Sequence, residues 1–106
     1  MEMTYKAENR ELTVRMSGEL DHHAARKAMQ SIEEWIEQNM PKKLILDLSG
    51  LSFMDSSGIA VMIRAKRRMD SVCGRLSVEN IPRQAARVLE TAGLDRYLDL
   101  TLGGQS

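Results

Sequence analysis

The apolar residues of this chain occur in short runs that alternate between the spacing of strands and the spacing of helices. The most apolar run, KLILDL, spans Lys43–Leu48 and is interrupted inside by one charged residue, Asp47. A run this short and this apolar is typical of a strand that is buried on both faces. The segment Ser49–Met54 contains two serines and a glycine, which predicts a loop. After Gly74 turns the backbone, Arg75–Glu79 is expected to form another short strand.

The beginning of the chain predicts a hairpin of two strands. In Glu11–Met16 the apolar residues alternate with polar residues, which is the pattern of a half-buried strand. Met1–Ala7 is the expected partner strand, because only the short polar segment ENR separates the two. Ser17–Leu20 is then expected to lead the chain out of the sheet.

Three later segments have the spacing of amphipathic helices. The first begins after Asp21, a favoured N-cap residue, and ends near Asn39. The second covers Ser56–Met69, and the third opens at Pro82 and ends before Gly93, a candidate C-cap glycine. The residues expected on the inner faces of these helices are Ala25, Ala28, Met29, Ile32, Ile36, Ile59, Met62, Ile63, Met69, Ala85, Val88, Leu89 and Ala92.

The predicted order of elements is β-β-α-β-α-β-α, with a last short strand around Leu98 and Leu100. This alternation predicts the α/β class, with a small, mostly parallel mixed sheet, an antiparallel N-terminal hairpin and packed helices. We expect a single domain over residues 1–106, with a frayed tail at residues 103–106. Sites in such sheets lie at the carboxyl ends of strands, so we expect the site at the segment after Lys43–Leu48.

Composition narrows the range of partners. The 15 lysine and arginine residues are balanced by 15 aspartate and glutamate residues, which argues against a nucleic-acid partner. No apolar run is long enough to cross a membrane, and no charged-then-apolar leader opens the chain. The one cysteine, Cys73, cannot form an internal disulfide, which fits a reducing compartment. We therefore expect a cytoplasmic protein that binds neither nucleic acid nor membranes.

Catalytic chemistry is poorly supported by the residues. Ser56 has the strand-to-helix setting of a hydrolase nucleophile, but the local sequence MDSSG lacks the G-x-S-x-G pattern. Only His22 and His23 could serve as its base, and adjacent helical residues make poor metal ligands because they point to different faces. No glycine-rich loop ends in Gly-Lys-Ser/Thr. A binding module without catalytic residues, metal or cofactor fits better, and a serine-dependent hydrolase remains an open alternative.

Ser56 is also a candidate for modification. A phosphate there would add about −1.5 to −2 charges at pH 7, at a helix N-terminus that favours anions. The adjacent Asp55 would oppose this charge by repulsion. A partner docked over the turn would meet new bulk and new charge, which predicts a local switch. The alternative is that the sequence DSSG is an ordinary N-cap.

Two motifs in the chain resemble one known family. The sequence LSGLSFMDSSG, Leu48–Gly58, resembles the central motif of the STAS domain family, the anti-sigma factor antagonists. The sequence GELDHH, Gly18–His23, is similar to a second signature that is typical of the sporulation branch, which controls sigma-F. The resemblance covers essentially the whole chain, and the STAS fold that it implies agrees with the predicted order of elements.

The resemblance implies a specific function. In that family the serine after the motif aspartate, here Ser56, is phosphorylated by the anti-sigma factor, which is a serine kinase. The unmodified form binds this kinase with its ADP or ATP and releases the sigma factor, and a phosphatase of the metal-dependent serine/threonine class resets it. An antagonist in another sigma-factor or stress pathway remains an alternative. The partner contacts that the resemblance implies are Asp21, His22, Met54, Asp55, Ser57, Gly58 and Ile59.

Overall fold

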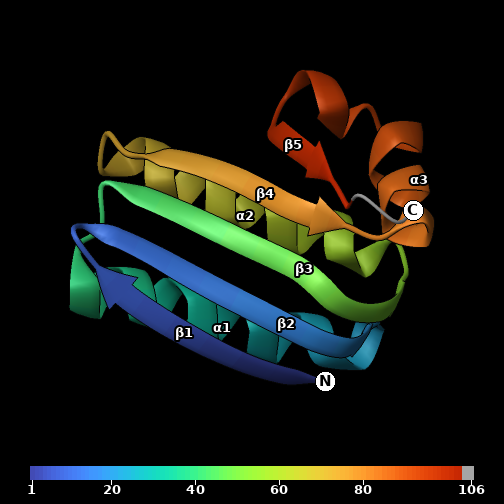
Figure 1. Cartoon of the computed structure of the whole chain (residues 1–106), viewed down its shortest axis with the longest axis horizontal. Helices are drawn as coiled ribbons and strands as arrows, with labels where there is room; N and C mark the ends of the chain where they lie inside the picture. Colours follow the sequence, from blue (N-terminus) through green and yellow to red (C-terminus); the bar gives the residue numbers. More distant parts are fainter. Residues whose placement is uncertain (104–106) are drawn as a thin grey trace.

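The computed structural model describes residues 1–103 and shows a five-stranded sheet with helices packed against it (Figure 1). The strand order is β1-β2-β3-β4-β5, with β1 antiparallel to β2 and every other neighbouring pair parallel. The predicted α/β class and order of elements are confirmed, including the last strand. The elements are β1 (Glu2–Glu8), β2 (Glu11–Leu20), α1 (His22–Asn39), β3 (Lys43–Met54), α2 (Ser57–Ser71), β4 (Arg75–Ile81), α3 (Arg83–Thr91), a 3-10 turn (Leu94–Arg96) and β5 (Asp99–Leu102).

Helices α1 and α2 lie on the same face of the sheet, behind it in Figure 1. Three leucines of β3 have no exposed surface, whereas Ile45 and Asp47 between them are only half-buried. Asp47 interrupts the apolar run because it lies on the opposite face, where its carboxylate accepts hydrogen bonds from the Ser49 N–H and the Asn80 amide. The prediction that Lys43–Leu48 is buried on both faces was therefore wrong.

The core fills the space between the sheet and its helices. Most of the predicted inner residues of the helices are buried, and four are half-buried, namely Met29, Ile59, Ile63 and Val88. The prediction for Ala92 was wrong, because α3 ends at Thr91 and Ala92 is exposed, and Ala86 is buried in the helix instead. The largest side chains with less than 2% exposed surface are Leu12, Met16, Leu20, Ile32, Ile36, Leu44, Leu46, Leu48, Met54, Met62, Met69 and Ile81.

Two predictions about the segments that lead to the site were wrong. Ser17–Leu20 does not leave the sheet, and Ser49–Met54 is not a loop, because the two segments pair with each other as the ends of β2 and β3. The pairing is irregular, with two register shifts. Gly50 permits the close approach, since a Cβ there would lie 2.5 Å from Ser17 Oγ and 2.8 Å from the Met16 carbonyl oxygen. Serine and glycine thus allow two bent strands to run close together up to the first helix.

The C-terminal part packs beside β4. Gly93 has a φ of 78°, which agrees with its predicted place at the end of α3. The Gly103 N–H donates to the Ile81 carbonyl at 3.0 Å, so the predicted frayed tail does not begin at Gly103. Residues 104–106, the rest of that predicted tail, lie outside the described residues. Within residues 1–103, no helix is both long enough and apolar enough to cross a membrane.

Candidate functional site

The turn between β3 and α2 is held by the carboxylate of Asp55. Its Oδ1 accepts from the Ser57 N–H at 2.8 Å, at the start of α2, and its Oδ2 accepts from the His22 N–H at 3.1 Å, at the start of α1. The Asp55 N–H donates to the Leu20 carbonyl at 3.2 Å, which extends the contact between β2 and β3. One side chain therefore joins the starts of two helices and brings the segments GELDHH and MDSSG together.

The start of α1 is capped as the sequence predicts. Asp21 Oδ1 accepts from the Ala24 N–H at 3.0 Å. His22 and His23 are exposed, and their ring centroids lie 5.8 Å apart in an edge-on arrangement. Among residues 1–103, no group of three His, Cys, Asp or Glu side chains is placed to hold a metal ion.

Ser56 occupies the N-cap position of α2, but its side chain does not cap the helix. The residue is exposed and makes no side-chain capping hydrogen bond. Asp55 caps the helix instead, because its Oδ1 accepts a hydrogen bond from the Ser57 N–H. The Ser56 hydroxyl therefore faces solvent and is not required for the structure of the turn.

The predicted contact residues differ in their exposure. Met54 has no exposed surface and Gly58 is buried, whereas Ser57 and Ile59 are half-buried. A Cβ on Gly58 would lie 2.5 Å from Met54 Cγ, so α2 begins in direct contact with the Met54 side chain. Met54 and Gly58 thus shape the turn from below, and the contact role of the whole set stays a prediction. Phe53, which the sequence analysis did not select, is 41% exposed beside them.

Gln84 at the beginning of α3 attaches this helix to the turn. Its Oε1 accepts from the Met54 N–H and its Nε2 donates to the Met54 carbonyl, both at 2.7 Å. The amide side chain thus pairs with the last residue of β3 as a neighbouring strand would. The sequence analysis missed Gln84, because nothing in its local pattern marks a glutamine whose partner lies 30 residues away.

We expect Gln84→Ala to lower the free energy of unfolding by about 1–2 kcal/mol, because both backbone groups of Met54 lose their partner. Urea denaturation measures this loss, and hydrogen exchange should quicken at the Met54 N–H. Gln84→Glu is the matched variant that separates the two hydrogen bonds. Its carboxylate can still accept from the Met54 N–H but cannot donate to the Met54 carbonyl. A loss in Gln84→Ala no larger than that in Arg83→Ala, the exposed neighbour, would contradict the role of the amide.

A groove of about 870 Å³ opens between the Ser56 turn and α3. We call it the Ser56 groove. Ile59 and Val88 contribute apolar surface to it, and Arg83 and Arg87 contribute two cations. Its remaining lining residues are Gln84, Thr91 and Ala92.

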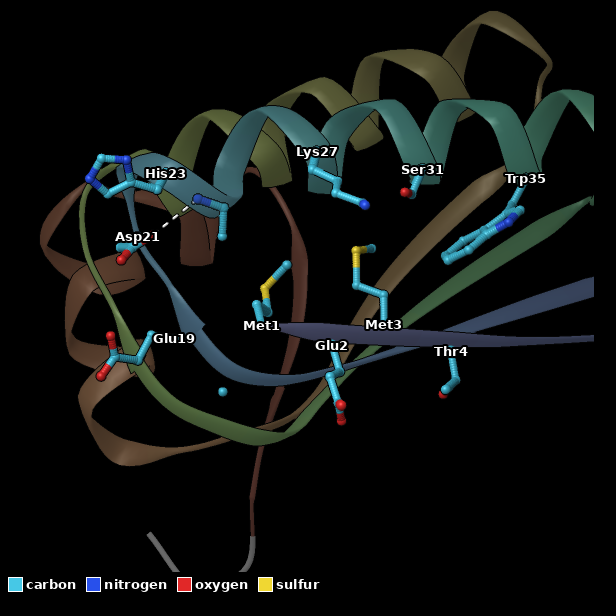
Figure 2. A pocket seen from close by; sticks show the side chains of 12 residues that line it. Met1, Glu2, Met3, Thr4, Glu19, Asp21, His23, Lys27, Ser31 and Trp35 are labelled. Atoms are coloured by element: carbon cyan, nitrogen blue, oxygen red, sulfur yellow. Dashed lines mark hydrogen bonds between the residues drawn. The ribbon is translucent and has the colours of Figure 1, made fainter.

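A separate hollow of about 1080 Å³ lies between β1 and α1. Figure 2 shows Lys27, Ser31 and Trp35 of α1 facing Met1 and Met3 across it. Of the predicted contact residues only Asp21 lines this hollow, and its carboxylate accepts the hydrogen bond from the Ala24 N–H described above. Apart from Asp21, the predicted site residues therefore do not line this hollow.

Comparison with known proteins identifies the family. The family model of the STAS domain matches residues 2–103. The chain belongs to the STAS domain family. This confirms the resemblance to STAS domains that the two motifs carried. In the structure of this STAS domain the motifs LSGLSFMDSSG and GELDHH meet at one turn, where Asp55 joins them.

Several relatives of this STAS domain have names that describe regulators of sigma factors. It is 34% identical over 87 residues to the anti-sigma F factor antagonist of Lysinibacillus sphaericus, covering 82% of this chain and 74% of that protein. Its fold is similar to the anti-sigma factor antagonist SpoIIAA in its unphosphorylated form, with a TM-score of 0.81, 29% identity and coverage of 93% and 87% of the two chains. It is also similar to the Bacillus cell fate determinant SpoIIAA in the phosphorylated form, with a TM-score of 0.72, 29% identity and coverage of 93% and 90%.

Proposed function

We propose that this STAS domain is an anti-sigma factor antagonist, which binds an anti-sigma factor when unmodified and so releases a sigma factor. The observation that carries the proposal is that Ser56 is exposed and its hydroxyl makes no capping hydrogen bond, at the turn where both family motifs meet. The names of the relatives support the general role. The protein is a regulator that works by binding, and no catalytic residue is assigned to it.

The switch that we propose is phosphorylation of Ser56 by the anti-sigma factor, acting as a serine kinase with bound ADP or ATP. Because the hydroxyl of Ser56 does not hold α2, its modification leaves the capping bonds of Asp55 intact. The phosphate adds about −1.5 to −2 charges and bulk to a surface that a partner must cover. Docking over Ser56 then requires the partner to desolvate this charge, and binding weakens.

The docking surface consists of exposed or half-buried residues around the turn. Asp21 and His22 contribute from the start of α1, and Ser57 and Ile59 contribute from α2. The exposed ring of Phe53 adds an apolar contact that suits the centre of an interface. Met54, Asp55 and Gly58 act on the same surface by fixing its shape.

The finer features of the proposal follow the relatives. The controlled sigma factor is the sporulation factor sigma-F, in accord with the similarity to the Lysinibacillus sphaericus antagonist. A serine phosphatase of the metal-dependent class removes the phosphate, and the exchange takes place in the cytoplasm, where sigma factors act. An antagonist in another sigma-factor or stress pathway is the second candidate, favoured by 24% identity over 96 residues to the anti-sigma-B factor antagonist of Bacillus subtilis.

We expect phosphate on Ser56, and not on Ser52 or Ser57, after incubation with ATP and the anti-sigma kinase. Ser56 is the exposed serine beside Asp55, whereas Ser57 is half-buried and its N–H is bonded to Asp55. Phosphopeptide mass spectrometry locates the phosphate, and Ser56→Ala should abolish incorporation while Ser57→Ala retains it. Phosphate found mainly on Ser52 or Ser57 would overturn the assignment. Turnover of ester substrates that is lost in Ser56→Ala would instead support a hydrolase.

A further inference from the structure

We propose that Arg83 and Arg87 form a binding site for the phosphoryl group of phosphorylated Ser56, inside the Ser56 groove. The ligand is a phosphate monoester carried by the same chain. This inference rests on the proposed function, because it assumes a phosphate at Ser56. It adds that the modified side chain folds against α3 and pairs with two guanidinium groups.

The first support is the placement of α3. Arg83 and Arg87 are four residues apart, so they lie on the same side of the helix. Both line the groove that Ser56 borders. Gln84, between them in sequence, binds both backbone groups of Met54 at 2.7 Å, two residues before Ser56. The first turn of α3 is thereby held beside the Ser56 turn by a direct attachment.

The second support is the lack of other ionic partners. Neither Arg83 nor Arg87 forms an ion pair with any residue in the described range 1–103, whereas Arg64 and Arg68 are paired with acidic residues of α1. Glu90, the one acidic residue of α3, does not line the groove. Arg83 and Arg87 are thus the charged side chains that line this groove, and both are cationic.

The third support is the electrostatic problem that the phosphate creates. The carboxylate of Asp55 stands directly before Ser56 and is committed to the N–H groups of His22 and Ser57. A phosphate dianion next to it is destabilised by repulsion unless cations offset the charge. Guanidinium groups suit this task because their planar donors match phosphate oxygens in paired hydrogen bonds.

Binding of the phosphate in the groove also changes the surface. The phosphate would lie across the half-buried side chains of Ile59 and Val88, which contribute apolar area in the unmodified form. Phosphorylation then removes part of the docking surface as well as adding charge to it. The pairing of the phosphate with Arg83 and Arg87 exists only in the modified chain. It holds the chain in the form that does not bind the anti-sigma factor.

The test uses the full chain with phosphoserine inserted at position 56 by genetic-code expansion, so that no kinase is needed. Phosphorus NMR across a pH titration gives the second pKa of the phosphate, which is ordinarily about 6. We expect the second pKa of the phosphate to be about 0.5–1 unit higher in the double variant Arg83→Gln/Arg87→Gln than in the parent, because the two guanidinium groups favour the dianion. The control Arg67→Gln removes an exposed cation of α2 that does not line the groove, and it should leave the pKa of the parent unchanged.

An equal phosphate pKa in the parent and in the double variant would overturn the inference. Thermal unfolding adds a second readout. Phosphoserine should raise the melting temperature of the parent and lower that of the double variant, and a fall of the same size in both would also overturn it. The kinase assay on Ser56 is independent of these measurements, so a kinase that transfers no phosphate contradicts the proposed function without altering the NMR result.

Discussion

Ser56→Asp is expected to weaken binding to the nucleotide-bound anti-sigma factor by about 30-fold or more, which is about 2 kcal/mol. The substitution places a negative charge on an exposed residue that the proposed partner must cover. A carboxylate there loses its hydration on docking, and the penalty exceeds the fraction of a kcal/mol by which the dipole of α2 favours the charge. Calorimetric titration against the anti-sigma factor measures the change.

Ser56→Ala is the matched variant that removes the phosphate acceptor without adding charge. Because the Ser56 hydroxyl makes no capping bond, the free energy of unfolding should change by less than about 0.5 kcal/mol. Binding should stay within about threefold of the parent, so that release of the sigma factor becomes constant. Gln38→Glu adds one negative charge at the far end of α1 and is the control for the net charge that Ser56→Asp adds.

Either of two results would change this account. If Ser56→Ala fails to bind while folded, the hydroxyl is a contact and not only the switch. If Ser56→Asp binds as tightly as the parent, a negative charge at position 56 does not weaken docking. The bulk of the phosphate must then weaken binding instead.

Asp55→Ala is expected to lower the free energy of unfolding by about 2–3 kcal/mol, the largest loss that we expect from a single substitution at the turn. The reason is that one carboxylate accepts from the N–H groups of both Ser57 and His22. Loss of an N-cap alone costs about 0.5–2 kcal/mol, and this side chain serves two helices. Urea denaturation gives the total loss, and hydrogen exchange at His22 and Ser57 shows whether both helix starts open.

Asp55→Asn separates the two bonds. The asparagine oxygen can still cap α2 at Ser57, but the amide group presents a donor to the His22 N–H. We expect it to retain about half of the stability that Asp55→Ala loses. Glu34→Ala removes an exposed acidic residue of α1 and should have little effect. Equal losses in the Ala and Asn variants would contradict the double role of the carboxylate.

The sequence pattern predicted most of the elements because each is encoded by local spacing. Alternation in Glu11–Met16 and helical spacing at Ala25, Ala28, Ile32 and Ile36 depend only on which side of the element each residue faces. These residues are buried or alternate as expected. The same local reasoning overestimated the burial of Lys43–Leu48, because periodicity does not reveal that helices cover one face of the sheet.

The errors near the site have a different cause. Ser49–Met54 has the composition of a loop, yet it is a strand because Ser17–Leu20 pairs with it. A strand pairing over that distance depends on a partner that no local window contains. Within this segment Gly50 is the residue that reflects the close approach of β2 and β3, because a side chain there would collide with Ser17.

By itself the sequence determined the class of fold, the family, and the candidate role of Ser56, because spacing and motif are properties of neighbouring residues. Only the tertiary structure decided what holds the turn. It assigned the cap of α2 to Asp55 instead of Ser56, joined the start of α1 to that carboxylate, and placed Gln84, Arg83 and Arg87 beside it. The contact of Asp55 with His22 joins residues 33 positions apart and that of Gln84 with Met54 joins residues 30 positions apart. Both exist because packing of the core brings the carboxyl ends of β2, β3 and β4 to one edge of the sheet.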